Sequence, residues 1–381
     1  MKIDRLSVKN FRCYREYNVT FSEGINVIIG ENATGKTSLA EAVFALSFTK
    51  SPRISDEKVL IKDGCDNFFI SGDFCGNLFN KYKISYGYDG EKKVIKKNQA
   101  VVRKISDYVG TIDVVWFSAN DLFLFVGSPQ NRRSNFDRIM CQISKVYYAA
   151  LSNYKKFLKE RNALLKRLNF ENSKQLKVLL ESLNEGIILE GKKIINIRAK
   201  TIHKINELLN QKHAFSKDQK ELLQIKYCNS VDVDNYSNVL NDSYIDDLRR
   251  GNTSFGPHKD DYIFIINNKN IVEEGSQGQQ RNAILNLKLA EVELINEVKK
   301  ETPILVLDDV FSELDEKRKN NILKRIPEGV QIIITATSLV EIDRDVVEKA
   351  NIISLKGDNW LWMKWIKKFS SITMIRAVFR Y

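Results

Sequence analysis

The feature that most constrains the fold is an eight-residue loop, Gly30-Glu31-Asn32-Ala33-Thr34-Gly35-Lys36-Thr37, which matches the pattern GxxxxGK[ST]. It directly follows the apolar run INVIIG and directly precedes TSLAEAVFAL, which has helical spacing. In that context the glycines let backbone N–H groups face a phosphate, Lys36 brings a positive charge to the β and γ phosphates, and the Thr37 hydroxyl can ligate Mg²⁺. The loop therefore predicts ATP binding on an α/β fold.

A second predicted half of this site is the apolar run ILVLDD, which ends in two carboxylates. Asp308 is the predicted Mg²⁺ ligand, and Asp309 is placed to orient or deprotonate an attacking water. Such an acidic pair after a strand can also serve as a turn or helix cap. A helix over residues 315–325 and a second unbroken apolar run, VQIIITATS, follow. Two such runs separated by a helix predict parallel strands in a covered sheet.

The stretch EEGSQGQQRNA, residues 273–283, opens another predicted helix. Ser276 is a good N-cap, but Gly278 lies inside the first turn, where it costs about 1 kcal/mol relative to alanine. Local structure gives no reason for that glycine. Further along, a stripe at helical spacing predicts a core-facing side, formed by Ala283, Leu287, Ala290, Leu294 and Val298.

The chain changes character along its length. Residues 64–116 read as short β-strands, whereas from Ser128-Pro129, a helix-start pattern, to about residue 227 there is no further proline and the spacing is helical. We therefore predict a split α/β domain, 1–116 with 250–356, and a basic helical insertion at 117–249. Residues 357–381, with three of the four tryptophans, do not continue the pattern. They read either as an aromatic, basic DNA-contacting tail or as an altered reading frame.

Charge indicates a polyanionic partner. The 60 Lys and Arg against 48 Asp and Glu leave a formal net charge of +12, and residues 145–226 alone hold 18 basic and 8 acidic side chains. DNA is one candidate partner, and a solvated lysine-rich helix face is the alternative. Five widely spaced cysteines argue against disulfides or zinc, and we expect buried thiols. A charged N-terminus and the lack of long apolar stretches predict a cytoplasmic protein without a membrane partner.

The order of these motifs resembles the ATP-binding cassette group that includes the SMC-type chromosome proteins, and within it the bacterial RecF family. The resemblance rests on LSVKNFRCY, GINVIIGENATGKTSLAEA, FSANDL, GSPQNRRSNFD, FGPHKDDY, SQGQQRNAILNLKLAEVELI and PILVLDDVFSELD. It runs from about residue 1 to residue 356. It implies an α/β fold, an ABC-type P-loop ATPase head with a mixed sheet and helices, into which a helical lobe is inserted.

The resemblance also implies a function. RecF-like proteins are ATP-dependent DNA-binding proteins thought to act at gaps and single-strand/double-strand junctions, working with RecO and RecR to help RecA load. The implied cofactors are ATP and Mg²⁺. The signature residues Ser276, Gly278 and Gln279 would close over the γ-phosphate held by a second subunit, so that ATP drives homodimerisation. Arg12, in the NFR motif, would approach the nucleotide; a surface arginine at a strand end is the alternative.

Some positions depart from related patterns. Ala33 and Thr34 differ from the usual RecF loop at variable positions. Asp309 and Thr337 stand where transport-type cassettes have Glu and a switch His, which suggests slow turnover. Together with the resemblance, this predicts an enzyme that is a weak, DNA-dependent ATPase. Arg132 and Arg133 are candidates for contact with a phosphate or with the dimer partner, or for a salt bridge with Asp137.

His258 has no metal constellation around it in the sequence. We interpret it as a turn residue whose role the sequence does not reveal.

Two other functions share these motifs. A transporter ATPase predicts the signature about a hundred residues after the P-loop, whereas Ser276 lies 240 residues beyond Lys36. An SMC-like structural bridge needs very long coiled-coil arms. An insertion of about 100 residues, folded as a hairpin of two helices, spans at most about 75 Å. The spacing thus disfavours a transporter, and the length of the insertion leaves room only for a compact helical lobe. The ATP-gated DNA-binding function that the RecF resemblance implies is the remaining hypothesis.

Overall fold

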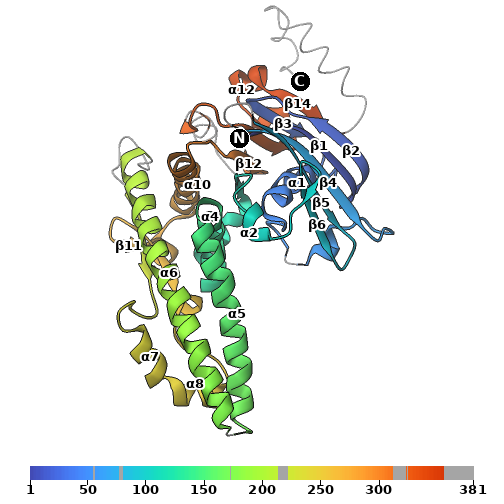
Figure 1. Cartoon of the computed structure of the whole chain (residues 1–381). Helices are drawn as coiled ribbons and strands as arrows, with labels where there is room; N and C mark the ends of the chain where they lie inside the picture. Colours follow the sequence, from blue (N-terminus) through green and yellow to red (C-terminus); the bar gives the residue numbers. More distant parts are fainter. Residues whose placement is uncertain are drawn as a thin grey trace, which may run out of the picture. The chain divides into compact units, whose positions relative to one another are not determined.

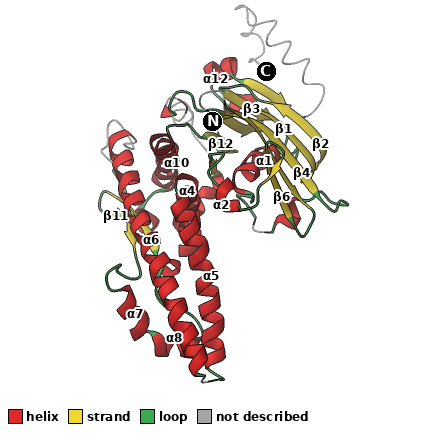
Figure 2. Ribbon diagram, viewed as in Figure 1, coloured by secondary structure: helices red, strands yellow, loops and turns green. Residues whose placement is uncertain are grey.

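The computed structural model describes residues 1–54, 56–76, 80–171, 173–212, 222–311, 323 and 325–355. The chain forms two compact units, Met1–Val101 with Ile304–Tyr381, and Val102–Pro303. Most of the helix predicted over 315–325, the SELD motif at 312–315 and the tail 357–381 lie outside the described residues. Figures 1 and 2 show the elements of both units.

The first unit contains most of the β-structure. Its elements are β1 (Lys2–Phe11), β2 (Tyr14–Thr20), β3 (Ile25–Ile29), α1 (Lys36–Phe48), η1 (Glu57–Leu60), β4 (Phe68–Cys75), β5 (Lys81–Tyr88), β6 (Lys93–Lys97), β7 (Ala100–Val101), β12 (Ile304–Asp308), β13 (Ile332–Ala336), η6 (Leu339–Glu341), α12 (Arg344–Lys349) and β14 (Asn351–Ser354). The strands β2-β1-β4-β5-β6-β7 form an antiparallel sheet in that order. In a second sheet, the strands β14, β3, β13 and β12 lie next to one another in that order and are parallel.

Helix α1 packs against both sheets of this unit, on β12 and β13 of the parallel sheet and on β1, β4 and β5 of the antiparallel sheet. Its side chains from Leu39 to Leu46 are almost completely buried. The two apolar runs at 304–308 and 332–336 are buried along their whole length and pair in parallel, as predicted. This packing holds the start of α1 beside the carboxyl ends of β3 and β12, because residues 30–37 directly connect β3 to α1.

The second unit is mainly helical. Its elements are α2 (Ile105–Tyr108), β8 (Val114–Ser118), η3 (Ala119–Leu122), α3 (Phe123–Val126), α4 (Pro129–Ile143), α5 (Lys145–Leu168), α6 (Lys174–Lys212), β9 (Leu223–Cys228), α7 (Tyr236–Asp242), α8 (Tyr244–Arg250), η4 (Pro257–Lys259), β10 (Asp261–Ile266), β11 (Lys269–Asn270), α9 (Ile271–Glu274) and α10 (Gln277–Lys299). Helices α5 and α6 form a hairpin, visible in Figure 1, whose far end is closed by buried leucines. Ser128 occupies the N-cap position of α4 and Pro129 is the first residue of the helix, as predicted, although the Ser128 side chain makes no capping hydrogen bond.

The division of the chain differs from the predicted boundaries at 117 and 249. Helix α10 packs on α4 and α6, so the segment that opens with Ser276 belongs to the same compact unit as the helical hairpin. The predicted boundaries were placed where the sequence changes from a strand pattern to a helix pattern. The compact units are instead defined by which elements pack together, so their boundaries need not coincide with a change in secondary structure. Which residues make up the ATPase domain in the functional sense stays a prediction.

Two smaller expectations need correction. Val298 is 51% exposed, because it lies in the last turn of α10, while the other four members of the predicted stripe are buried. The cysteines are free thiols, as expected, but Cys13 is exposed and the other four are partly exposed. Among the described residues, no helix combines the length and apolar character needed to cross a membrane.

Candidate functional site

The loop between β3 and α1 has the backbone shape that its sequence predicts. Gly35, the N-cap of α1, has φ 99°, a left-handed conformation that glycine adopts without strain. A Cβ at Gly35 would also lie 2.5 Å from Tyr14 Oη. Ala33 has φ 65°, so the turn carries a second left-handed residue. Glycine at position 35 is therefore needed for both conformation and space.

Lys36 is almost completely buried, and its ammonium group lies within the loop. Its Nζ donates to the carbonyl oxygens of Gly30, at 2.7 Å, and Glu31, at 2.9 Å. Glu31, Asn32 and Ala33 are exposed. The loop thus combines an accessible backbone arch, a positive charge inside it and the N-terminus of a 13-residue helix, which together suit the phosphates of a nucleotide.

The predicted metal ligands meet at the carboxyl edge of the parallel strands. Thr37 Oγ1 donates a 2.8 Å hydrogen bond to Asp308 Oδ1, although the two residues are 271 positions apart. Thr335 Oγ1, from β13, donates a second 2.8 Å bond to the same oxygen. Burial raises the pKa of Asp308, while these two hydrogen bonds act in the opposite direction.

Asp309 is exposed directly after the buried Asp308. Its φ of 55° is left-handed, and its backbone N–H donates to Thr335 Oγ1 at 2.9 Å. Thr335 therefore holds both acidic residues in position, one through its carboxylate and one through its backbone. Thr335 was not among the predicted site residues. Its place in ITATS, one position before the end of a strand adjacent to β12, is the sequence signal that could have indicated it.

The turn between β1 and β2 lies against the P-loop. Tyr14 Oη donates to the carbonyl of Thr34 at 3.3 Å, and burial raises the Tyr14 pKa well above its usual value. Arg12 forms a bidentate pair with Glu41 of α1, with N–O distances of 2.7 and 2.8 Å. Glu41 is fully buried. Arg12 is thus fixed to the helix that follows the P-loop, and its proposed contact with the nucleotide stays a prediction.

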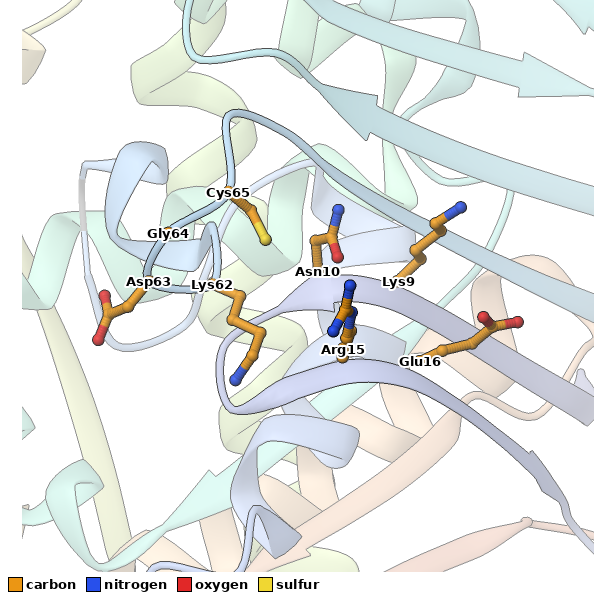
Figure 3. A pocket seen from close by; sticks show the side chains of 8 residues that line it. All are labelled: Lys9, Asn10, Arg15, Glu16, Lys62, Asp63, Gly64 and Cys65. Atoms are coloured by element: carbon orange, nitrogen blue, oxygen red, sulfur yellow. The ribbon is translucent and has the colours of Figure 1, made fainter.

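A hollow of about 760 Å³ lies on another side of the same turn (Figure 3). The backbone of Lys62 donates to Asn10, and its ammonium group donates to the Cys13 carbonyl at 2.8 Å, so residues around 62 support the turn. The lining mixes basic and acidic side chains and includes no P-loop residue: Lys9, Asn10, Arg15, Glu16, Lys62, Asp63, Gly64 and Cys65. This hollow is therefore separate from the phosphate-binding loop.

The predicted signature residues form a capping box at the start of α10. Ser276 Oγ accepts from the backbone N–H of Gln279 at 3.2 Å, and Gln279 Oε1 accepts from Ser276 N–H at 2.9 Å. Ser276 is exposed and Gly278 is half-buried. Reciprocal capping explains Ser276 and Gln279 structurally but leaves Gly278 unexplained, because its φ is not left-handed.

The structure gives Arg132, Arg133 and His258 internal partners. Arg132 binds Asp261 through two nitrogens, at 2.6 and 2.8 Å, and Arg133 donates to the carbonyl of Asp260. Neither pairs with Asp137, which binds Arg198 instead.

His258 lies between the Tyr154 hydroxyl, 2.7 Å from Nδ1, and the Thr253 carbonyl, 3.0 Å from Nε2. Burial lowers the His258 pKa to about 4. In the described part of the chain no cluster of three or more His, Cys, Asp or Glu suits a metal.

The mixed α/β architecture and the P-loop site define an ABC-type ATPase head, the predicted fold class. Residues 1–360 match the family model described as AAA ATPase domain. The head domain of Smc from Pyrococcus furiosus shares the fold, with a TM-score of 0.51 at 18% identity over 96% of this chain and 98% of that chain.

More similar proteins narrow this class. "DNA replication and repair protein RecF" from Bacillus cytotoxicus is 38% identical over 367 residues, 94% of this chain and 97% of the relative. A protein of the same description from Bacillus thuringiensis is also 38% identical, over 93% and 96%. A solved structure titled "Structure of the recombination mediator protein RecF-ATP in RecFOR pathway" has a TM-score of 0.84 at 34% identity over 90% and 93%. The chain belongs to the RecF family.

Proposed function

We propose that this protein binds DNA in an ATP-dependent manner in recombinational and replication-gap repair, in the cytoplasm. ATP-driven homodimerisation clamps gapped or junction DNA, helps RecO and RecR to load RecA, and is reset by slow, DNA-dependent ATP hydrolysis. Membership of the RecF family supports the pathway. The ATP-dependent part of this proposal rests on one observation: Lys36, Thr37 and Asp308 lie together at one edge of the parallel sheet.

In this proposal the P-loop residues bind and orient the triphosphate. Backbone N–H groups of residues 30–37 donate to phosphate oxygens, and the Lys36 ammonium exchanges its two carbonyl partners for the β and γ phosphates. Exchange is favourable because an ammonium–phosphate contact is stronger than one to a neutral carbonyl.

The residues also fit Mg²⁺. Thr37 Oγ1 and Asp308 Oδ1 are a hydroxyl and a carboxylate oxygen, 2.8 Å apart, which are ligand types that Mg²⁺ prefers. When bound there, Mg²⁺ supplies positive charge that neutralises phosphate oxygens. Thr335 keeps the Asp308 carboxylate oriented through its own 2.8 Å hydrogen bond.

Asp309 is the proposed residue that orients the attacking water. We predict that Asp309→Asn binds ATP but hydrolyses it about a hundredfold more slowly and holds the dimer on DNA, because the amide is no base. Asparagine tolerates the left-handed backbone at this position, so the variant is expected to fold. Phosphate release and nucleotide binding are the measurements. Turnover near that of the wild type would assign the role to another group.

DNA binding gives the direct test of the clamp. Affinity for a gapped duplex should be tighter with ATP than with ADP and should fall steeply with salt, because two basic subunits release many counterions. The experiment is a salt titration with each nucleotide, with sedimentation to follow dimerisation. Equal affinity with ATP and ADP, or no dependence of log affinity on log salt concentration, would contradict the proposal of an ATP-driven clamp.

A mixing experiment tests whether Ser276 serves the ATP of a second subunit. Lys36→Ala and Ser276→Arg should each be inactive as homodimers. In a mixed dimer, the intact P-loop of one subunit faces the intact signature of the other, so one complete site forms. With half the dimers mixed and independent sites, hydrolysis recovers to about a quarter of wild type. No recovery despite demonstrated subunit exchange would contradict independent composite sites.

The lengths of the helices argue against an SMC-like bridging role. Helix α5 has 24 residues, so it spans about 36 Å, and α6, with 39 residues, about 58 Å. These are lengths of a compact lobe rather than of a long coiled-coil arm. The transporter alternative remains disfavoured by the 240-residue interval between Lys36 and Ser276.

A further inference from the structure

A second groove, of about 500 Å³, runs along α5 in the helical unit. Lysine and asparagine side chains provide all the polar groups of its lining: Lys155, Lys159, Asn162, Lys166 and Asn252. No acidic side chain lines it. It contrasts with the hollow at the β1–β2 turn, where Glu16 and Asp63 face three basic side chains.

The three lysines share one face of the helix with Asn162. The spacings from Lys155 to Lys159, Asn162 and Lys166 are 4, 7 and 11 residues, which places all four on one stripe. At 1.5 Å per residue the stripe is about 16 Å long. Glu160 and Lys156 lie off this stripe, so the nearest acidic side chain in the sequence does not neutralise it.

These lysines also lack the carboxylate partners that some lysines of the same hairpin have. Within the described ranges, none of Lys155, Lys159 and Lys166 has a carboxylate oxygen within 4 Å. On α6, by contrast, Lys193 pairs with Glu190, and Lys204 pairs with Glu207 and Glu297. Other exposed lysines of α6, such as Lys174, Lys177 and Lys200, also have no ion pair in the described residues, but only Lys155, Lys159 and Lys166 line the groove together.

A buried ion pair holds the wall of the groove. Arg161, on the opposite side of α5, is fully buried and donates to Asp247 at 2.8 Å and to Thr253 at 2.7 Å. These bonds fix the segment after α8 against α5. Thr253 in turn donates through its N–H and its hydroxyl to Asn162 Oδ1, at 2.9 and 2.7 Å. Because that oxygen is occupied, Asn162 offers its NH₂ donor to the groove.

Lys166 is positioned by the same segment. Gly251 has φ 64°, and a Cβ there would lie 2.8 Å from Lys166 Cγ, so the loop approaches the lysine stem closely. The groove is therefore held in shape by these contacts, and the only charged side chains in its lining are lysines.

We propose that this groove binds the sugar–phosphate backbone of DNA. The inference rests on the proposed DNA-binding function and adds the surface to it. One strand of duplex DNA carries a phosphate about every 3.4 Å of helix axis, so the lysine stripe extends along about five phosphates. Three flexible ammonium groups without acidic neighbours contact phosphates without reading sequence, which suits a protein that recognises gaps rather than a sequence.

The test compares two triple variants of the full-length protein with equal loss of charge. Lys155→Gln, Lys159→Gln and Lys166→Gln removes the groove charges and keeps the side-chain stems. The matched control, Lys174→Gln, Lys177→Gln and Lys200→Gln, removes three exposed lysines of α6 that do not line the groove. The probe is a labelled gapped duplex with ATP, titrated with salt, with ATP-driven dimerisation measured in parallel.

The groove variant is expected to bind the duplex at least about tenfold more weakly at physiological salt, with a salt slope smaller by about three, while it dimerises with ATP as the wild type does. The control should change the slope by less than about one. Equal losses in both variants, or an unchanged slope in the groove variant, would overturn the proposal. An unchanged slope together with lost binding of purified RecO or RecR would assign the groove to a protein partner. Failure of the wild type itself to bind DNA with ATP would instead refute the proposed function.

Discussion

Charged side chains are buried near strand and loop ends in two regions of this protein. The two regions differ in whether the buried charges remain available to a ligand. At the P-loop edge, Lys36 and Asp308 are buried, but Asp309 and residues 31–33 beside them are exposed. In the helical unit, Arg198 is buried among Asp137, Asp260, the Tyr147 hydroxyl and the Pro257 carbonyl, with N–O distances of 2.7 to 2.9 Å. There the guanidinium and both carboxylates are satisfied internally.

The two regions differ in the groups that bind the buried cation, Lys36 in one and Arg198 in the other. Lys36 is held by two carbonyls of a partly exposed loop, which another anion can replace. Arg198 is held by two carboxylates, each with further donors: Tyr147 on Asp137, and Tyr227 and Ser230 on Asp260. The first arrangement leaves a positive charge available to a ligand, and the second joins α4, α6 and the loop before β10. Replacement of either charge should therefore affect different properties.

Loss of the Arg198 charge should have the largest effect. We predict that Arg198→Met lowers the free energy of unfolding by about 3–5 kcal/mol, because Asp137 and Asp260 remain buried without their cation. Urea denaturation followed by circular dichroism measures this, with exposed Lys200→Met on the same helix as control. A loss below about 1 kcal/mol would mean that the cluster does not stabilise the fold, and the comparison with the P-loop would fail.

Loss of the Lys36 charge should instead affect activity. Lys36→Ala is expected to reduce ATP hydrolysis about 10²- to 10³-fold, since the transferred phosphate loses a preorganised cation. Stability should change by less than about 1 kcal/mol, because the carbonyls of Gly30 and Glu31 lie in a partly exposed loop. ATPase assays and urea denaturation are compared with exposed Lys50→Ala. Wild-type turnover and ATP affinity in Lys36→Ala would refute the P-loop assignment.

His258 extends the comparison to pH. Its folded-state pKa of about 4 lies below the usual 6.5, so the unfolded chain takes up the proton first as pH falls. The neutral ring therefore contributes stability that is present above about pH 6.5 and is lost as pH falls toward 4. By linkage, the unfolding free energies of wild type and His258→Gln should converge by about 2 kcal/mol between pH 7.5 and pH 5. A constant difference would show that His258 does not titrate in this way.

Gly278 gives the smallest expected change in stability. Gly278→Ala should stabilise α10 by about 0.5–1 kcal/mol, because glycine inside a helix costs conformational entropy. If Gly278 serves a composite site, the same variant should dimerise less readily with ATP. Thermal unfolding and sedimentation with ATP measure the two effects, and Gln277→Ala is the control. Greater stability together with unchanged dimerisation would leave the glycine without a role in the interface.

The P-loop edge was predictable from sequence because its residues are contiguous or end an apolar strand. Residues 30–37 form the loop, and Asp308 follows four buried residues of β12, so strand pairing alone brings Thr37 and Asp308 to one edge. The partners of isolated charges were not predictable. Arg132 and Arg133 were candidate phosphate contacts, but folding pairs them with Asp261 and the Asp260 carbonyl, well over a hundred residues away in sequence.

The sequence alone determined the ATPase class and the order of strands and helices around the P-loop, because local spacing encodes them. It also determined the excess of positive charge through composition, and the resemblance of its motifs indicated the family. Only the tertiary structure decided which charges are neutralised. It buries Arg198 and Arg161 in ion pairs, pairs Arg12 with Glu41, and leaves Lys155, Lys159 and Lys166 unpaired along one groove. The physical reason is that a charge's availability depends on the distance to its nearest counter-charge, and long-range packing sets that distance.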